Sequence, residues 1–472
     1  MKKHYFTLYF LLIFGSVYSQ NFTIQNNIES VLISPNGLKT NRSTTTGKNN
    51  ISIGLDALKA ATTATKSVAI GDSAMLKTTD GGQSVAIGIN AMRENTIGGY
   101  NVAIGNDAMR NNIAGYANVA VGNEALYANN GLFNTSIGNS SMNKNTMGGS
   151  NTAIGNSTLF SNTTSSSNIA IGNNALNNQS FSNGGTNYDS NNIAIGVDAL
   201  KINNPTNSLN GNNNIAIGRS SLQSNTFGKQ NISIGFEAQK STTAGFGNIS
   251  IGTQALSYNV GGVGNVAVGN FSMPYSDNTS ETTSIGNLSG FMAVNCHRCT
   301  FLGSRADLDA MTPNATFFEN STTIGYNAKV FTSNKVVIGN ANVITIGGYA
   351  SWSNYSDKRL KENILYTDKL GLEFISKLNT ASYNYIKDEN KRRRDGLIAQ
   401  DVKQILKELG LEFSGLIEDN DPQKTLNLSY IEFIMPLINA VKELNAKNKD
   451  LQSKIDKLAN LQARIEALES GK

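Results

Sequence analysis

The chain has 472 residues, a formal net charge of +5 at pH 7, two cysteines and two histidines. This length is too great for one compact core and predicts several modules, and the slight net charge argues against a nucleic-acid-binding surface. Because only His297 lies beyond the first four residues, a two-histidine metal site is excluded. Any acid–base chemistry must therefore use lysine, acidic residues or tyrosine.

Composition divides the chain in two. Residues 21–350 carry 17 Lys/Arg and 15 Asp/Glu, whereas the much shorter stretch 351–472 carries 20 and 19. The first part is rich in Asn, Ser, Thr and Gly, and the second is charged like an ordinary soluble domain. We therefore expect a neutral, repetitive part followed by a conventional folded module.

The first 19 residues have the features of an export signal. Two lysines follow the first methionine, an apolar run covers residues 5–15, and Val17 and Ser19 occupy the small-residue positions before a cut that leaves Gln20 first. The run is too short for a membrane span, and no second apolar stretch follows. An uncleaved anchor is the alternative. The sequence predicts an exported chain, extracellular or at the cell surface, with no membrane span.

A short phrase of the type Asn-Ile-Ala-Ile-Gly recurs along about two thirds of the chain. Twelve of the sixteen steps between its glycines are 16 or 17 residues long. The glycines are Gly54, Gly71, Gly88, Gly105, Gly122, Gly138, Gly155, Gly172, Gly196, Gly218, Gly235, Gly252, Gly269, Gly286, Gly303, Gly325 and Gly339. A helical solenoid needs about 33 residues or more per unit, so this period predicts stacked β-coils over residues 50–347. At roughly 4.8 Å per coil, ~17 coils would form a rod on the order of 80 Å long.

Each phrase has the alternation of a short strand. The apolar residues Val102 and Ile104 point one way, and the small residue Ala103 points the other way. A second apolar position follows four residues after the glycine, as at Met109. We expect two short strands and two glycine corners per coil, the second corner at pairs such as Gly98-Gly99. We also expect the small Ala, Ser and Thr positions to face outward, where they can lie against a copy of the same chain.

The iterated Ser-Val-Ala-Ile-Gly and Asn-x-Ala-Ile-Gly phrases resemble the head repeats of trimeric autotransporter adhesins. The resemblance covers roughly residues 50–347 and implies a left-handed parallel β-roll in which three chains lie side by side. The usual period of 17 residues is longer than the common adhesin unit. The implied partner is the chain itself, and a host or surface glycan or protein is the further ligand expected of the shaft.

Neither the acidic residues nor the cysteines of the repeats form a clear catalytic or metal-binding pattern. The position two residues after the repeat glycine carries a carboxylate in five units: Asp56, Asp107, Glu124, Asp198 and Glu237. Because Leu288 and Arg305 occupy the same position elsewhere, we interpret it as a solvated turn and expect no metal and no cofactor. Cys296 and Cys299 form a lone C-x-x-C, which we interpret as a local disulfide or packed thiols.

The composition changes within ten residues of Gly348, and two short motifs follow. They are Ser-Asp-Lys-Arg-Leu-Lys-Glu-Asn-Ile at residues 356–364 and Gly-Leu-Ile-Ala-Gln-Asp-Val at residues 396–402. Both resemble the intramolecular chaperone auto-protease domain that ends phage endosialidase tailspikes, from Ser356 to about Leu444. The resemblance implies a domain that trimerises, drives folding of the β-structure ahead of it and cuts itself off. It implies Ser356 and Lys361 as the cutting pair and Ser356–Asp357 as the bond.

The proposed cutting chemistry agrees with the residues present. A serine hydroxyl needs a base, and lysine can act as one if burial lowers its pKa toward neutrality, which trimer assembly could supply. The alternative is structural, with Ser356 as the cap of a basic helix start and Lys361 as a solvated charge. Which bond is cut also stays open. Attack by the Ser356 hydroxyl on its own carbonyl needs a strained four-membered ring, whereas attack on the Tyr355 carbonyl allows a five-membered one. A serine or lysine from a neighbouring chain eases this difficulty.

The module also contains an amphipathic stretch at residues 370–378, an aromatic strand at 383–385 and a Leu-rich helix to residue 409. In the last segment of the chain, two apolar positions repeat every seven residues. One position holds Ile434, Val441, Asn448, Ile455 and Gln462, and the other holds Leu437, Leu444, Leu451, Leu458 and Ile465. They predict a coiled coil of about five heptads, in which the polar residues Asn448 and Gln462 fix register and oligomer number. A single amphipathic helix packed on its own domain is the alternative. Three strands fit the expected shaft, although heptads alone also allow two.

These observations predict a mainly β fold, with a left-handed, trimeric parallel β-roll solenoid followed by a small α+β chaperone domain and a C-terminal coiled coil. The expected segments are a signal peptide at 1–19, an N-terminal segment at 20–49, the repeat array at 50–347, a linker at 348–355, the chaperone and auto-protease domain at 356–433 and the coiled coil at 434–468.

The predicted function is that of an exported homotrimeric, adhesin-like surface fibre. Its C-terminal chaperone drives assembly and is released by Ser356–Lys361 autoproteolysis, a serine-peptidase reaction with no external substrate. A secreted glycan depolymerase is one alternative, although no segment is long and non-repetitive enough for a separate catalytic domain. A phage-derived tail fibre is another, although such fibres assemble in the cytoplasm and the export signal argues against it.

Overall fold

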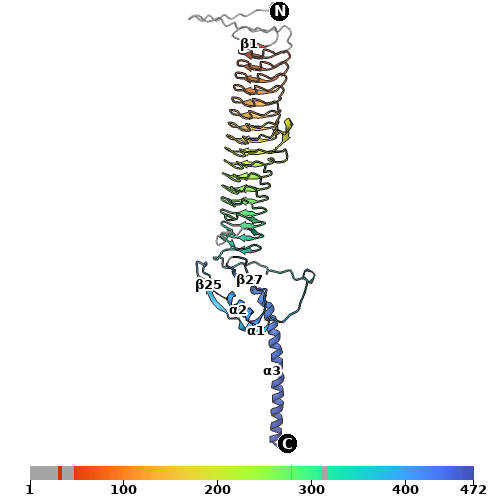
Figure 1. Ribbon diagram of the computed structural model, residues 1–472, viewed down its shortest axis with the longest axis vertical. Helices are drawn as coiled ribbons and strands as arrows, with labels where there is room; N and C mark the ends of the chain where they lie inside the picture. The colour runs from red at the N-terminus through yellow and green to blue at the C-terminus, as the bar shows by residue number, and fades with distance from the viewer. Residues whose placement is uncertain (1–29, 34–46, 278, 310–316, 422, 472) are drawn as a thin grey trace, which may run out of the picture. The chain divides into compact units, whose positions relative to one another are not determined.

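The computed structural model describes residues 30–33, 47–277, 279–309, 317–421 and 423–471. Short strands dominate most of the chain, and a small mixed region and a long helix follow toward the C-terminal end (Figure 1). The fold class is the predicted one, a parallel β-solenoid followed by an α+β region. The chain forms two compact units, Met1–Arg298 and Cys299–Lys472. The signal peptide expected at 1–19 lies outside the described residues.

In the first unit, three-residue strands stack into one parallel ladder. Neighbouring strands pair in register, so that Ala103 of β5 lies beside Ala120 of β6. The ladder begins with a strand ahead of residue 50. Its strands are β1 (Val31–Ile33), β2 (Ile51–Ile53), β3 (Val68–Ile70), β4 (Val85–Ile87), β5 (Val102–Ile104), β6 (Val119–Val121), β7 (Thr135–Ile137), β8 (Thr152–Ile154), β10 (Ile169–Ile171), β12 (Ile193–Ile195), β13 (Ile215–Ile217), β14 (Ile232–Ile234), β15 (Ile249–Ile251), β16 (Val266–Val268) and β17 (Thr283–Ile285).

A regular coil has one strand, so the prediction of two was wrong. After Gly105, which has a φ of 135°, the chain turns through Asp107 and Met109 with φ of 55° and 51°. Left-handed residues cannot continue a strand, yet the coil-to-coil hydrogen bonds persist, since the Met109 N–H donates to the Ala125 carbonyl at 2.9 Å. In the described part of this unit, further strands are two-residue pieces: β9 (Ser165–Ser166), β11 (Tyr188–Asp189) and β18 (Cys296–His297), with a 3-10 turn η3 (Asn183–Gly185) before β11.

The faces of the strands are the reverse of the prediction. Ala103 is 0 % exposed, whereas Ile104 beside it is 37 % exposed. The same pattern runs from β2 to β17, where the central Ala or Ser is buried and both flanking residues retain contact with solvent. Alternation alone does not say which face is inside. The Leu or Met of the turn, such as Met109, is fully buried in the same coil and leaves room only for a methyl or hydroxyl group opposite.

The asparagine that opens most phrases is buried and joins neighbouring coils. The side-chain amide of Asn118 donates to the Gly131 carbonyl at 2.9 Å, and its oxygen accepts from the Asn134 N–H at 2.9 Å. The Asn118 N–H in turn donates to the Asn101 side-chain oxygen at 2.9 Å. Asn112 belongs to a second such column. These amides pair backbone groups that a corner would otherwise leave unpaired away from water.

The second unit begins with three more coils. Their strands β19 (Thr300–Leu302), β22 (Thr322–Ile324) and β24 (Val336–Ile338) pair in parallel. The short strands β20 (Asp307–Leu308) and β23 (Lys329–Val330) also pair, and β21 is Phe318–Glu319. Phe301, fully buried, takes the inward position that Ala or Ser occupies in the first unit.

A small module with an aromatic core follows the linker. Its elements are η4 (Lys358–Leu360), α1 (Leu372–Lys377), β25 (Ala381–Asn384), β26 (Arg393–Gly396), α2 (Ala399–Leu409), β27 (Leu416–Glu418), β28 (Leu426–Leu428), η5 (Tyr430–Phe433) and α3 (Ile434–Glu469). β25 pairs with β26 and β27 with β28, both antiparallel. Phe374, Val402, Leu406, Phe413 and Phe433 form the buried core. The predicted amphipathic, aromatic and Leu-rich segments correspond to α1, β25 and α2.

The long helix α3 has the length that the heptads predict. Its apolar heptad positions are exposed in the single chain, with Val441 and Leu458 both 64 % exposed. They form a stripe of large apolar side chains that the core of their own module does not cover. Within the part of the chain that the structure describes, no helix is long and apolar enough to span a membrane.

Candidate functional site

A single 3-10 turn positions the two side chains of the predicted cutting pair. The turn η4 is capped by Asp357, whose carboxylate accepts a hydrogen bond from the Arg359 N–H at 2.8 Å. It closes with a hydrogen bond from the Lys361 N–H to the Lys358 carbonyl at 3.2 Å. Aspartate is a favoured cap, so the local sequence forms this turn readily. The cap is thus Asp357 and not Ser356, and the capping role considered for the serine is not the one it has.

Lys361 reaches back across the turn to Ser356. Its amino group donates a hydrogen bond to the serine hydroxyl oxygen at 2.8 Å. This distance lies within the roughly 2.6–3.2 Å expected between a nucleophile and its base. Both side chains are exposed in the single chain. A charged lysine only donates hydrogen bonds, so the pair has the geometry of a dyad but needs a neutral amine to act as one.

The carboxylate next to the serine is held by the neighbouring arginine. The guanidinium of Arg359 donates to Asp357 at 2.6 Å from Nη2, and Nε lies 3.1 Å from each carboxylate oxygen. These hydrogen bonds, together with the Arg359 backbone N–H, hold the pKa of Asp357 below its usual value. Asp357 is therefore an ionised group committed to the turn and is not the partner of the Ser356 hydroxyl.

Large apolar side chains near the pair are exposed. Tyr355 precedes the serine, and Leu360 belongs to the turn itself. Leu365 and Tyr366 follow a few residues later, and all four side chains are more exposed than most of the shaft's outward residues. The pair therefore lies in a segment with several uncovered apolar groups.

The second motif forms part of the module's frame. The Leu397 N–H donates a hydrogen bond to the Tyr430 hydroxyl at 2.8 Å. A Cβ added to Gly396 would lie 2.4 Å from that hydroxyl oxygen, so only glycine leaves the tyrosine in place. The hydrogen bond to Tyr385, followed by burial, raises the pKa of Tyr383 beside this glycine to about 12. The motif thus joins β26 and α2 to the segment ahead of α3.

The repeat carboxylates and the two cysteines, which were the other candidates in the sequence, lie in ion pairs or in the interior. Four repeat carboxylates form ion pairs with a basic residue three positions later: Asp56 with Lys59, Asp107 with Arg110, Asp198 with Lys201 and Glu237 with Lys240. Among the residues that the structure describes, no group of three or more His, Cys, Asp or Glu side chains could hold a metal ion. Cys296 and Cys299 are both buried.

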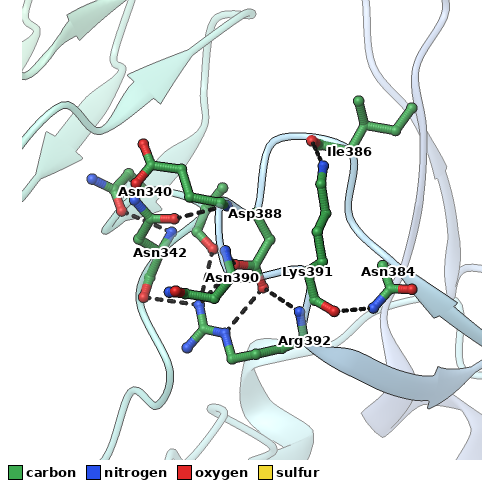
Figure 2. A network of polar contacts seen from close by, with 10 residues as sticks. Asn340, Asn342, Asn384, Ile386, Asp388, Asn390, Lys391 and Arg392 are labelled. Carbon is green, nitrogen blue, oxygen red and sulfur yellow. Dashed lines mark hydrogen bonds and ion pairs between the residues drawn. The ribbon is translucent and has the colours of Figure 1, made fainter.

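Sequence reasoning missed one polar network, which Figure 2 shows. The Arg392 guanidinium donates to the Asp388 carboxylate at 3.0 Å and to the Asn342 carbonyl at 3.0 Å. Lys391 donates to the Ile386 carbonyl at 2.6 Å within the same loop. Asn342 directly follows the last coil, whereas the other residues lie in the loop between β25 and β26. The run of basic residues at 391–394 was visible in the sequence, but their partner about fifty residues earlier was not.

One comparison with known proteins places the site in context. Residues 356–411 match the model of a family described as the chaperone of endosialidase, and the match begins at Ser356. A search of curated proteins finds no match to the chain. The C-terminal module is therefore similar to an endosialidase chaperone, a kind of domain that implies trimer assembly. Together with the solenoid, it fits a trimeric, tail-fibre-like protein.

Proposed function

We propose that this chain is the subunit of an exported homotrimeric fibre, in which the solenoid is the shaft and the C-terminal module assembles the trimer. The shaft then acts in adhesion or as a surface layer, with a host or surface glycan or protein as its ligand. The proposal rests on two uncovered apolar surfaces and on the similarity of residues 356–411 to an endosialidase chaperone. The export signal predicted from the sequence of residues 1–19 supports the location.

The first apolar surface is the outward ladder of the shaft. Each coil adds a pair of Val, Ile or Thr side chains beside the pair of the coil before it, because the strands are in register. Ile104, Ile154 and Ile251 are among the exposed members. Monomeric soluble proteins rarely expose a continuous apolar stripe of this extent, so a second and a third copy are the occupants that the repeat favours.

The second apolar surface is the heptad stripe of α3. Leu444, Leu451 and Ile455 are about half exposed and lie on the face that a coiled coil buries. Asn448 lies between them and provides a polar contact that specifies register. A parallel coiled coil would bring three modules together at one end, and the coils could then pair from that end along the shaft.

The Ser356–Lys361 hydrogen bond is the single observation that carries the proposed cut. In its neutral form, Lys361 takes the hydroxyl proton of Ser356, and the oxygen attacks the carbonyl carbon of the Ser356–Asp357 bond of a neighbouring chain. The C–N bond breaks, and the Asp357 nitrogen leaves as an amine with the proton returned from the lysine. Water then hydrolyses the ester, which restores the attacking hydroxyl and leaves a carboxylate on the cut chain. Attack between chains avoids the four-membered ring.

Assembly would switch this chemistry on. In the single chain the pair is exposed, and the apolar side chains of Leu360, Leu365 and Tyr366, close to it in sequence, are uncovered. Packing of three chains against these side chains would remove water from the pair. Burial favours the neutral amine of a lysine, which is the form that can accept a proton. A chain that has not assembled is therefore left intact.

The test is the intact mass of the purified, exported protein. The parent chain should be cut at Ser356–Asp357, whereas Ser356→Ala and Lys361→Ala should each give a full-length chain. Lys358→Ala, which removes another exposed lysine of the same turn, is the matched control and should be cut like the parent. Cutting near residue 356 that persists in either dyad variant would refute the pair.

A phage-derived tail fibre that assembles in the cytoplasm is the second candidate, favoured by the family match at residues 356–411. The two candidates differ in the first 19 residues. An exported fibre loses them, and Gln20 becomes its first residue. N-terminal sequencing of the protein from the native host distinguishes the two candidates, because a fibre that assembles in the cytoplasm keeps the residues before Gln20.

A further inference from the structure

The contacts within the second unit join the two sides of the proposed cut. The segment after the last coil and the loop between β25 and β26 lie on opposite sides of the Ser356–Asp357 bond. Arg392 Nη2 spans them by donating to the Asn342 carbonyl at 3.0 Å and to the Ala341 carbonyl at 3.4 Å (Figure 2). Breaking the chain at residue 356 leaves these hydrogen bonds in place.

A buried carboxylate fixes the arginine that makes this contact. Asp388 is 0 % exposed and Arg392 is 24 % exposed, and they form an ion pair at 3.0 Å. The hydrogen bond from Arg392 is the main reason that the pKa of Asp388 lies below its usual value. A charge taken out of water must be paired to be stable, so Asp388 holds the guanidinium in the orientation that meets the segment after the last coil.

Two ion pairs also join the coils ahead of the proposed cut to the module behind it. Lys335 of the segment before β24 lies 2.5 Å from Asp419, which follows β27 and is only 6 % exposed. Lys387 lies 3.6 Å from Asp309. The Lys387 ammonium also lies 5.9 Å from the centre of the Phe331 ring. The Asp419 carboxylate is nearly buried, and an ion pair with such a group is worth more than an exposed one.

We propose that these contacts form a docking surface that keeps the cut C-terminal fragment bound to the end of the shaft, so that cutting and release are separate steps. We call the shaft side of this contact the coil-end surface, and it consists of Lys335, Ala341 and Asn342, with Asp309 at its edge. Its partner is the fragment that begins at Asp357. This proposal rests on the proposed cut. Release then requires that the charged contacts be broken, and the fragment remains as a cap until that happens.

The test separates docking from self-cutting. A recognition sequence for a site-specific protease is inserted between Gly348 and Tyr355 of the full chain carrying Ser356→Ala, so that only the added protease cuts. The cut sample is analysed by size-exclusion chromatography and native mass spectrometry. We expect the two fragments to stay together at about 0.15 M salt and to separate as salt rises toward about 1 M, where charges are screened over about 3 Å.

Substitutions locate the contact. Arg392→Gln combined with Lys335→Gln should speed separation by about tenfold or more, because the Asn342 carbonyl loses its charged donor and the nearly buried Asp419 loses its partner across the cut. Arg393→Gln is the matched control, since Arg393 donates to Ser382 inside the hairpin at 3.0 Å, and it should behave like the parent. Fragments that part at once at low salt, or that part equally fast with and without the double substitution, would overturn the docking surface. A parent chain that does not cut itself would instead refute the proposed cut and leave this result unaffected.

Discussion

Ala103 and Ile104 are consecutive residues of one strand, yet the first is fully buried and the second is 37 % exposed. The inside of a regular coil is closed by a small Ala or Ser side chain and, in most coils, by the Leu or Met of the turn. The larger β-branched side chains point to the outside, where they repeat from coil to coil. The shaft therefore presents its apolar residues where another chain can bury them.

The two faces should respond differently to substitution. Ala120→Leu adds volume to an interior without room, and we expect it to destabilise the shaft by about 1–3 kcal/mol. Ile104→Ala changes only the outward ladder, and we expect each chain to fold while the assembly becomes weaker. Thermal unfolding and sedimentation measure the two effects. If Ala120→Leu were tolerated and Ile104→Ala unfolded the chain, the assignment of the small residues to the inside of the coil would be wrong.

The asparagine column should be sensitive to loss of its amide. Asn118→Ala leaves the buried Asn134 N–H without its acceptor, whereas the Gly131 carbonyl loses one donor and keeps the Asn129 amide at 3.0 Å. An unpaired buried group costs about 1–3 kcal/mol, so we expect a lower unfolding temperature. Asn118→Ser is the matched control and should be milder, because Ser84 fills the same position and accepts from the Asn101 N–H at 3.1 Å. Equal stability of the Ala variant and the parent would contradict this role.

The heptad stripe should matter only in the assembly. Leu451→Glu places a charge on the expected seam of α3, and we expect it to dissociate the helices and leave the protein poorly assembled. Lys457→Glu changes the charge of the same helix two residues after Ile455, on the side away from the seam, and we expect the oligomer to persist. Analytical ultracentrifugation of the two variants checks this. Similar behaviour of both would favour a helix that acts alone.

The module should lose stability at high pH. The pKa of Tyr383 is raised to about 12 from its ordinary value of 10.0, chiefly by the hydrogen bond to Tyr385. A raised pKa means that the folded module prefers the protonated phenol, so its contribution is complete below pH 10.0 and is lost between that value and about 12. Circular dichroism against pH measures this. Tyr383→Phe should reduce the alkaline loss, and Tyr349→Phe, in the exposed linker, should not.

Sequence reasoning reached the architecture of the shaft because the period of the glycines leaves few alternatives. It did not predict which side chains point inward. Alternation is the same for both faces of a strand, and only the width of the coil decides which face is inside. One clue was present, since the residue between Val102 and Ile104 stays small along nearly the whole ladder. Narrow interiors demand small residues, whereas an outward position would vary more freely.

At the site, the resemblance of the motif predicted Ser356 and Lys361 as a pair, and the two side chains lie within hydrogen-bond distance. The capping role of Asp357 was not foreseen, although aspartate is as good a cap as serine. The contact between Arg392 and Asn342 could not be predicted, because nothing in the sequence connects residues so far apart. Only the folding of the second unit brings the two residues together.

The native mass of the full-length Ser356→Ala protein tests the central claim most directly. The account predicts a stable assembly of three uncut chains at micromolar concentration, because both the outward ladder and the heptad stripe of α3 need partners to cover them. A folded, stable single chain at that concentration would contradict the account.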